Sequence, residues 1–296
     1  MADIKLFRTK NQVKQLKSSQ VLLEKHLQTL IENNMEEFFG VRFLKSEYVI
    51  SNGRMDSIGI DENNCPVIFE YKRNLNENVI NQGLFYLDWL LDHKADFKLL
   101  VLEKLGQSVA DEIDWSVPCV VCIANDFTKY DLHAVNQMQR NIKLVKYRKY
   151  DDDLILFDHL NVPNVKADTQ NNDDSKKIYG QKTHLEKLAA APDNIKELYD
   201  EVCEFIESLG DDIAANQLKL YLAYKKVQNI VCIEVKTKHV ALFLKLDPDG
   251  IELEDGFTRD MRKIGHFGTG NLEVIVSNES DFEKAKPLIE KAYYEG

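Results

Sequence analysis

The residues best placed to do chemistry lie in a short, mostly apolar segment, Pro66–Lys72. If this segment is a strand, its alternation places Glu70 and Lys72 on one face and Phe69 and Tyr71 on the other. Charged side chains are seldom placed in such strands unless they are paired or bind a partner. For an isolated Glu-x-Lys pattern, a structural ion pair is the ordinary explanation, and a catalytic or metal-binding pair is the alternative.

Asp56 is a further acidic residue that the fold could bring to the same place. It lies in a second predicted strand, 54–60, and the turn at 61–64 would pair the two strands as a hairpin. Asp56 would then reach the Glu70 carboxylate. Two carboxylates at one place suit Mg²⁺, which binds one or two carboxylates together with water and substrate phosphate.

Three further residues complete an ordered pattern. Glu24 lies at the front of a predicted helix, and Gln82 and Tyr86 are four residues apart in the helix that follows the strands. The order of helix with Glu, strand with Asp, strand with Glu-x-Lys and helix with Gln-x-x-x-Tyr resembles the PD-(D/E)XK nuclease superfamily, RecB type. The resemblance covers about residues 20–150, and Met55 stands where the name-giving pattern has Pro.

The resemblance implies a role for each residue. Asp56 and Glu70 would bind Mg²⁺ or Mn²⁺, with Glu24 joining them directly or through water. Lys72 would orient or deprotonate the attacking water and offset charge on the phosphate. A supporting role, at the site or on the nucleic-acid backbone, falls to Gln82 and Tyr86. Two of these residues have ordinary alternatives: Glu24 as a solvated helix residue and Tyr86 as a core residue.

Basic residues that could contact phosphate lie in two places. Arg54 and Arg73 flank the predicted metal site. Residues 140–149 include five basic residues and no acidic one, and a strand there would place Lys146 and Arg148 on one face. Phosphate contacts are one explanation, and a sheet edge protected by charge is the other.

Hydrophobic periodicity and turn residues predict the elements that must position these residues. A helix over 21–39 ends at Gly40. Further strands are predicted over 43–50, 97–102, 117–124, 142–150 and 154–157, and further helices over 78–93, 107–113 and 129–140. Strands alternating with helices indicate an α/β domain over 1–160, a mixed sheet flanked by helices. The resemblance implies that this domain is restriction-endonuclease-like.

The second half is predicted to be a small α+β domain, 181–296, that follows a polar linker, 161–180. Capping patterns at Thr183 and Ser280 begin helices, and Pro287 should kink or shorten the last one. Another helix is predicted from Asp193 to near Gly210, and strands over 229–235, 240–246 and 272–276. Segments between 185 and 296 resemble an uncharacterised bacterial domain sometimes labelled a predicted transport protein, which assigns no chemistry.

A glycine-rich segment, Gly265–Gly270, is the outstanding feature of the second half. Its backbone N–H groups could bind an anion, but it lacks the Lys-Ser/Thr ending of a P-loop and is not followed by a predicted helix. A hairpin loop is the alternative. The polar candidates for a ligand site here are Arg259, Asp260 and His266, and a small-ligand sensor is a third, weaker functional hypothesis.

Composition restricts the location and the partners. The 296 residues carry a net charge of −11, which at first argues against nucleic acid, but residues 1–166 carry 21 basic and 24 acidic groups and are nearly neutral. No run of 18 apolar residues and no secretory signal is present, so we expect a cytoplasmic protein without a membrane segment. Five cysteines read as reduced thiols, and Cys119-x-x-Cys122 as a buried strand.

The leading hypothesis is therefore a Mg²⁺- or Mn²⁺-dependent nuclease that acts on nucleic acid, DNA in the first place, with a second domain that selects the target or partner. A homodimer is also open. The alternative is a non-catalytic nucleic-acid-binding or interaction module that retains the nuclease scaffold.

Overall fold

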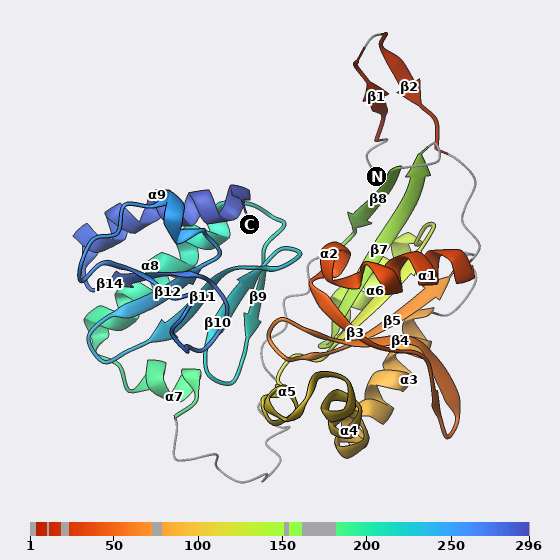
Figure 1. Cartoon of the computed structure of the whole chain (residues 1–296), viewed down its shortest axis with the longest axis horizontal. Coiled ribbons are helices and arrows are strands. Elements are labelled where there is room, and N and C mark those ends of the chain that lie inside the picture. The colour runs from red at the N-terminus through yellow and green to blue at the C-terminus, as the bar shows by residue number, and fades with distance from the viewer. Residues whose placement is uncertain are drawn as a thin grey trace.

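The computed structural model contains two six-stranded sheets with helices packed on them and a separate two-stranded ribbon (Figure 1). It describes residues 4–10, 12–18, 24–72, 79–150, 154–161 and 182–295. The first sheet is built from the first half of the chain and the second sheet from the second half. Arg73 and nearly all of the predicted linker lie outside the described residues.

The first sheet is mixed, as the sequence predicts. Its spatial order is β3 (Val41–Ile50), β4 (Gly53–Asp61), β5 (Pro66–Lys72), β6 (Cys119–Ala124), β7 (Asn141–Tyr150) and β8 (Leu154–His159). β3, β4 and β5 are antiparallel neighbours, β5, β6 and β7 are parallel, and β8 is antiparallel to β7.

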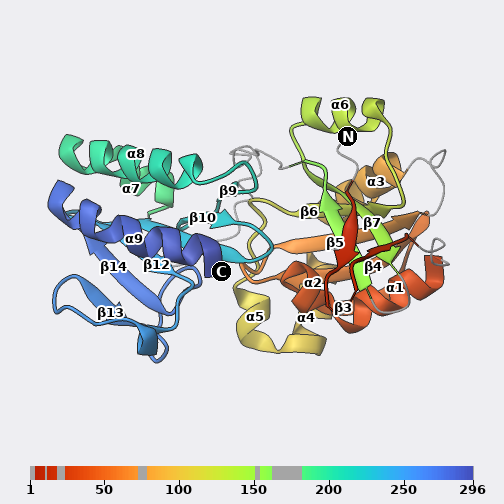
Figure 2. The ribbon, with the colours of Figure 1, turned by 90° about the horizontal axis from the view of Figure 1, so that it is seen from above.

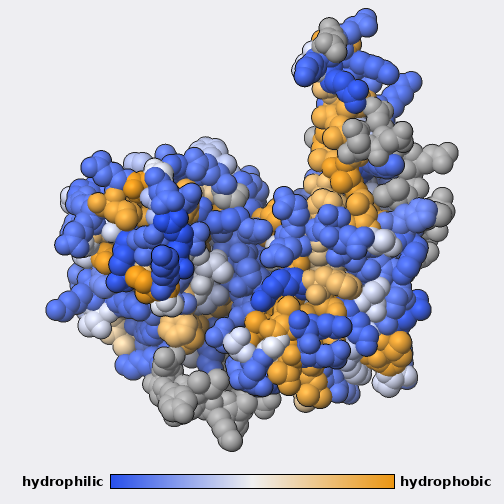
Figure 3. Space-filling view, viewed as in Figure 1, coloured by the Kyte–Doolittle hydropathy of each residue, from blue (hydrophilic) through white to orange (hydrophobic). Residues whose placement is uncertain are grey.

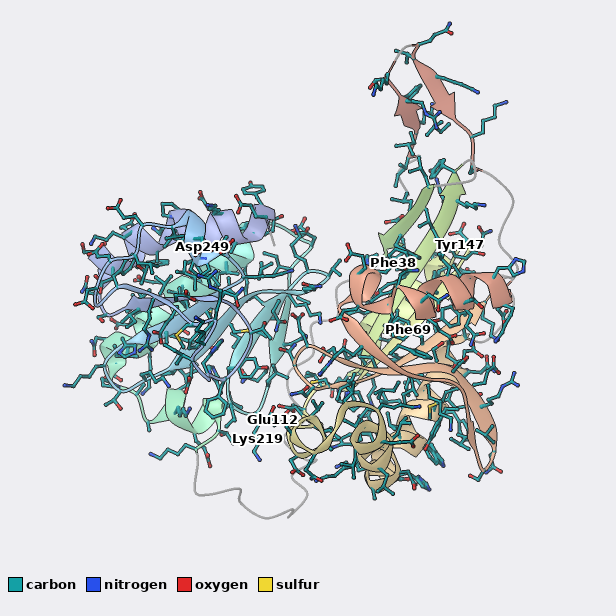
Figure 4. All side chains as sticks on the ribbon, viewed as in Figure 1. Phe38, Phe69, Glu112, Tyr147, Lys219 and Asp249 are labelled. Atoms are coloured by element: carbon teal, nitrogen blue, oxygen red, sulfur yellow. The ribbon has the colours of Figure 1, made fainter. Side chains whose placement is uncertain are left out.

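Helices cover both faces of this sheet. One face carries α1 (Glu24–Asn33) and α2 (Met35–Phe39), and the other carries α3 (Val79–Asp92), α4 (Lys94–Leu105), α5 (Gln107–Asp111) and α6 (Lys129–Gln137). The predicted alternation of β5 is confirmed: Phe69 and Tyr71 pack under α1 and α2, whereas Ile68 packs under α3. Figure 4 labels Phe38 of α2 and Phe69 of β5. Strands covered on both faces are almost continuously apolar, so a charged residue in β5 stands out.

Two predicted elements differ from the structure. Residues 97–102, predicted as a strand, lie within α4, whose buried side chains Phe97, Leu100 and Val101 recur at helical spacing while Leu99 is exposed. A short apolar run fits either element when judged alone. The helix predicted over 21–39 divides into α1 and α2 at Asn34, and it ends at Gly40, whose φ of 63° suits a glycine cap.

The Cys-x-x-Cys sequence is a buried strand, as predicted. Cys119 faces the core under α1 and α2, whereas Cys122 faces the core under α3. Burial raises the pKa of Cys119 to about 11, and both side chains are free thiols. A shared metal or disulfide is therefore excluded for this pair, since the two thiols point to opposite faces.

The second sheet is antiparallel throughout. Its spatial order is β13 (Thr258–Asp260), β14 (Leu272–Val276), β12 (Val240–Leu244), β11 (Asn229–Val235), β10 (Leu222–Lys225) and β9 (Ala214–Gln217). The helices of this half are α7 (His184–Ala189), α8 (Asp193–Ser208) and α9 (Glu279–Glu295), with a 3₁₀ turn at Pro248–Gly250. α8 and α9 lie side by side on one face of the sheet (Figure 2), which agrees with the predicted α+β arrangement.

Of the two helix caps predicted in this half, only the one at Thr183 is confirmed. Thr183 and Glu186 form the predicted capping box of α7. At α9 the cap is Asn278, whose Oδ1 accepts a hydrogen bond from the Asp281 N–H at 3.1 Å, rather than Ser280. α9 also continues through Pro287 to Glu295, so of the two predicted effects, a kink or a shortening, the shortening does not occur. Within the described residues, no helix has the length and apolar character to cross a membrane.

The two halves meet through the turn that joins β4 to β5. Cys65 of this turn and Val117 pack in one buried cluster with Tyr221, Cys232 and Phe243 of the second half. Near this junction the N–H of Lys219 donates to Asp114 Oδ2 at 3.2 Å, beside the labelled Glu112 and Lys219 of Figure 4. The face of the second sheet opposite α8 and α9 is therefore partly covered by the first half.

Polar contacts reinforce this junction. Lys225 is 3% exposed, and its Nζ lies 3.4 Å from Asp61 Oδ2 and 3.2 Å from Glu62 Oε1. The side-chain amides of Asn63 and Asn229 hydrogen-bond to each other at 2.5 and 3.1 Å. Buried charges and amides with this many partners hold the two halves in one relative orientation.

Candidate functional site

The site lies where β4 and β5 separate. Their ladder runs from Ile60 to Ser57 on β4 and stops there. One residue further, the Asp56 side chain replaces the backbone partner: its Oδ2 accepts a hydrogen bond from the Tyr71 N–H at 3.0 Å. The Asp56 N–H in turn donates to Glu70 Oε1 at 3.3 Å. The opening of the hairpin thus brings the two carboxylates together, as the sequence predicts.

A pocket of about 430 Å³ opens at this point. Elements far apart in the sequence contribute to it: the start of α1, the facing ends of β3 and β4, the end of β5 and one face of α3. Its lining residues are Glu24, Val49, Gly53, Arg54, Asp56, Glu70, Lys72, Gln82 and Tyr86. Every predicted catalytic residue, both predicted helix residues and one of the two flanking arginines therefore line a single pocket.

The two buried carboxylates are costly to ionise together. Glu70 is 1% exposed, and burial together with the neighbouring Asp56 charge raises its pKa from 4.5 to about 9. Burial also raises the pKa of Asp56, while the Tyr71 N–H and the Lys72 charge act in the opposite direction. Like charges this close cannot both ionise easily without a counter-charge.

The donor set fits a hard divalent cation. Asp56 and Glu70 each use one oxygen in the hydrogen bonds above, and no hydrogen bond within the described residues reaches Asp56 Oδ1 or Glu70 Oε2. The described part of the chain contains no group of three or more His, Cys, Asp or Glu side chains that could hold a metal ion. Two carboxylates nevertheless suit Mg²⁺, which completes its shell with water and substrate oxygens.

Lys72 and Glu24 meet at the edge of this pocket. Lys72 Nζ lies 3.9 Å from Glu24 Oε1, so the first residue of α1 reaches the end of β5. The alternation of β5 places Lys72 on the same side of the strand as Glu70. An ammonium beside two buried carboxylates can orient a water or a phosphate oxygen.

Tyr86 serves both the core and the pocket. It is 6% exposed, and its hydroxyl accepts a hydrogen bond from the Arg54 N–H at 3.4 Å. A Cβ at Gly53 would lie 2.8 Å from the Tyr86 ring, so a larger residue at Gly53 would displace the ring. Gln82, one turn earlier on α3, also faces the pocket.

Two residues near the site were not predicted. Gln28 is 4% exposed and donates from Nε2 to the Asp56 carbonyl at 2.8 Å. Its place one turn after Glu24 was the only signal in the sequence. Glu47 has φ of 53° and binds Arg54 at 2.5 Å and Lys25 at 3.3 Å, which fixes Arg54 at the mouth of the pocket.

The basic residues of β7 differ from the expectation. Lys146 is 6% exposed and its Nζ lies 2.6 Å from Asp126 Oδ1, so its charge is used inside the fold and does not face phosphate. Arg148 is half-buried on the same strand, at the end of the sheet beyond the pocket. Arg73 lies outside the described residues.

The three polar candidates of the second half are not brought together. Arg259 pairs with Glu273 at 2.7 Å. Asp260 pairs with Arg262, also at 2.7 Å. The ring of His266 stacks on Phe243, with the centroids 4.5 Å apart. Each residue has a separate partner, so the structure lends no support to a shared ligand site.

The glycines of the same loop have a packing role. Gly268 has φ of 85° and Gly270 φ of 129°, in the left-handed range that glycine adopts without strain. A Cβ on Gly268 would lie 2.7 Å from Cys232, and one on Gly270 would lie 2.7 Å from the Phe243 backbone. The loop joins β13 to antiparallel β14, which agrees with the hairpin alternative.

Parts of solved structures resemble this chain at low identity. The EndoMS–dsDNA complex is 18% identical, with 45% of this chain and 50% of that chain covered, at a TM-score of 0.29. A repair endonuclease from Pyrococcus abyssi is 17% identical, with 44% and 50% covered, at the same score. SfsA of Pyrococcus furiosus in complex with Ca²⁺ is 13% identical, with 54% and 76% covered, again at 0.29. The match thus spans about half of each endonuclease chain, and the functional proposal rests on the side chains of the pocket.

The second half matches a family described as a domain of unknown function, DUF5655, over residues 185–295. Along nearly its full length the chain is similar to an uncharacterized protein of Haemophilus influenzae strain Rd. The two are 32% identical over 302 residues, which cover 98% of this chain and 99% of the other. Identity of this extent shows that the chain belongs to the same family as the Haemophilus influenzae protein.

Proposed function

We propose that this protein is a divalent-cation-dependent nuclease that hydrolyses phosphodiester bonds in DNA. One observation carries the proposal: the six residues of the PD-(D/E)XK-like pattern line one pocket, although they come from four separate elements. A structural ion pair would account for Glu70 and Lys72 alone. It would not account for Glu24 and Gln82 at the same opening.

The residues of the pocket divide the work of phosphodiester hydrolysis. Asp56 and Glu70 would hold Mg²⁺ or Mn²⁺, with Glu24 at the edge beside Lys72. The bound cation would offset the charge of the scissile phosphate and lower the pKa of the attacking water. Lys72 would orient that water and offset the negative charge that grows on the phosphate oxygens.

Hydrolysis of the phosphodiester needs no reactant besides water. The water oxygen forms a bond to phosphorus as the bond to the leaving sugar oxygen breaks. The proton released by the water ends on that sugar oxygen. Gln82 and Tyr86 would keep the pocket wall in place against the substrate backbone, since both lie on the same face of α3. The second half, fixed to the β4–β5 turn, would select the target or partner.

A cleavage assay tests the proposal. Purified full-length protein is incubated with single-stranded, duplex and branched DNA and with RNA, in Mg²⁺, Mn²⁺ or EDTA. We expect cation-dependent cleavage that Asp56→Asn and Lys72→Met each abolish. Glu103→Gln, on an exposed side chain of α4, is the matched control and should cleave like the wild type.

Two results would count against it. No cleavage of any substrate in either cation, or equal cleavage by the Asp56→Asn protein, would refute the nuclease. Tight binding of nucleic acid without cleavage would favour the non-catalytic binding module.

A further inference from the structure

Residues 4–10 and 12–18 include a ribbon that projects from the first half. β1 (Leu6–Arg8) pairs antiparallel with β2 (Lys14–Leu16), and Figure 1 shows the pair extending beyond the ends of β7 and β8. In Figure 3 the outermost part of the projection is hydrophilic, and apolar atoms line its lower part. Its exposed apolar residues are Ile4, Leu6, Phe7 and Val13. Residues 4–18 contain five basic residues and no acidic one, within a chain of net charge −11. All of these basic residues are exposed: Lys5, Arg8, Lys10, Lys14 and Lys17.

We call this ribbon the basic ribbon. In its register, a basic residue of β1 lies opposite a basic residue of β2. Arg8 stands directly opposite Lys14, and the same register, if continued toward the base, would bring Lys5 level with Lys17. Like charges directly opposite in a strand pair are destabilising, and an isolated two-stranded ribbon is marginal in water. A polyanion lying along the ribbon would turn this repulsion into attraction.

The base of the basic ribbon lies at the edge of the sheet that carries the pocket. Ser18 makes a bridge to Tyr150, the last residue of β7. One side of Tyr150 is already paired with Leu154 of β8. Ser18 therefore occupies the other side, toward β6 and β5, above the ends of those strands.

The parallel register of β5, β6 and β7 shows how near the Ser18–Tyr150 bridge is to the pocket. Lys72 of β5 is level with Ala124 of β6, which is level with Lys146 of β7. Tyr150 lies four residues beyond that level, or about 13 Å further along the sheet. Ser18 is only six positions before Glu24 of the pocket, so their Cα atoms are at most about 22 Å apart.

We propose that the basic ribbon binds the phosphate backbone of duplex DNA next to the pocket, an inference that rests on the proposed nuclease function. The major groove admits a two-stranded ribbon, so the exposed lysines and Arg8 can meet phosphates on either side of it. The ribbon supplies the concentrated positive charge that the chain as a whole lacks. It holds the duplex while the pocket meets one strand.

The test measures binding apart from cleavage. Full-length protein is titrated into a fluorescent 30-base-pair duplex in EDTA, and anisotropy is recorded across a range of salt concentrations. We expect Arg8→Glu with Lys14→Glu to weaken binding at least about tenfold near 0.1 M salt. The slope of log affinity against log salt should fall by about 2, because two phosphate contacts are lost.

Two further proteins control for charge and folding. Lys182→Glu with Lys238→Glu makes the same change in charge on exposed residues of the second half and should bind like the wild type. The milder pair Arg8→Gln with Lys14→Gln should lose a smaller part of the affinity. A thermal melt equal to that of the wild type shows that either ribbon variant is folded.

Several results would overturn the proposal. It fails if the wild type does not bind the duplex, or if the ribbon reversal binds as tightly as its control. It also fails if the wild type is a dimer that the reversal converts to a monomer without loss of DNA affinity, because the ribbon would then be a self-association surface. A protein that binds through the ribbon but never cleaves refutes only the nuclease, and one that cleaves with unchanged affinity after reversal refutes only the ribbon.

Discussion

The two ends of the β4–β5 ladder are flanked by acidic residues in opposite electrostatic surroundings. At one end Asp56 lies beside a second buried carboxylate, Glu70, and burial raises the pKa of both. At the other end Asp61 accepts hydrogen bonds from the N–H groups of Asn63 and Cys65, both at 2.9 Å. It also faces Lys225 at 3.4 Å. The same ladder thus lies between a carboxylate pair that Lys72 and Arg54 compensate only in part and a carboxylate that Lys225 compensates fully.

The difference agrees with the proposed division into a functional site and a structural one. Burial alone would lower the pKa of Lys225, but Asp61 and Glu62 raise it above its ordinary value, so this ion group keeps its charges inside the domain junction. A buried charge without a partner costs several kcal/mol, and proteins retain such a cost mainly where a ligand supplies the missing charge. In the proposed function, the Asp56–Glu70 end is the one that a cation would complete.

The largest effect should be the loss of DNA cleavage when Glu70 is neutralised. Glu70→Gln is expected to reduce cation-dependent DNA cleavage by at least about 10²–10³-fold, because half of the cation-binding pair is lost. Its stability in urea should stay within about 1 kcal/mol of the wild type, since the raised pKa already favours the neutral acid at pH 7. Cleavage rates and urea unfolding measure the two quantities. A strongly destabilised but active variant would reverse the assignment of this end.

At the other end of the ladder, removal of the Lys225 charge should instead reduce the stability of the fold. Lys225→Met leaves Asp61 and Glu62 at the junction without their buried cation, and we expect a loss of about 3–5 kcal/mol in the free energy of unfolding. Lys238→Met, on an exposed turn, should change it by no more than about 0.5 kcal/mol. Urea unfolding compares the two. Equal unfolding midpoints would show that the junction does not depend on this ion group.

A third buried ionisable group, His184 of the second half, should make the free energy of unfolding depend on pH. His184 is 0% exposed, its Nε2 lies 3.1 Å from the Tyr199 hydroxyl, and burial lowers its pKa to about 4. The folded state then binds fewer protons than the unfolded state. The contribution of His184 to the free energy of unfolding is therefore complete above pH 6.5 and is lost as the pH falls from 6.5 to 4. The loss should approach about 3 kcal/mol. Urea unfolding of the wild type and His184→Gln between pH 7 and 4 measures it, and parallel curves would contradict it.

The smallest effect should come from the wall of the pocket. Tyr86→Phe removes only the acceptor of the Arg54 N–H, a long hydrogen bond of 3.4 Å. We expect about a fivefold lower kcat/KM for DNA cleavage, equivalent to about 1 kcal/mol. Tyr130→Phe, on a side chain that is 72% exposed, is the control. A loss as large as that of Glu70→Gln would instead place the Tyr86 hydroxyl on the substrate.

Local patterns predicted much of the candidate site. Alternation along Pro66–Lys72 correctly placed Glu70 away from Phe69 and Tyr71, because side-chain direction in a strand depends on residue order alone. The helical spacing of Gln82 and Tyr86 likewise placed both toward the same opening. These inferences needed no knowledge of distant contacts.

Three of the failures concern how a segment packs against distant parts of the chain. Residues 97–102 were predicted as a strand because the pattern does not show which partner buries the run. Lys146 was expected to face phosphate, but Asp126, twenty residues earlier, engages it. Gln28 was missed because only the packing of α1 on the sheet brings it to the Asp56 carbonyl.

The sequence by itself determined which residue types could bind a divalent cation and phosphate, the order of the elements that carry them and the mixed character of the first sheet. The tertiary structure decided which charges are compensated. It paired Lys225 with Asp61 across the domain junction and left Asp56 beside Glu70 in a pocket. The physical reason is that the energy of a charge depends on burial and on neighbours within a few ångströms, and both are set by segments far away along the chain.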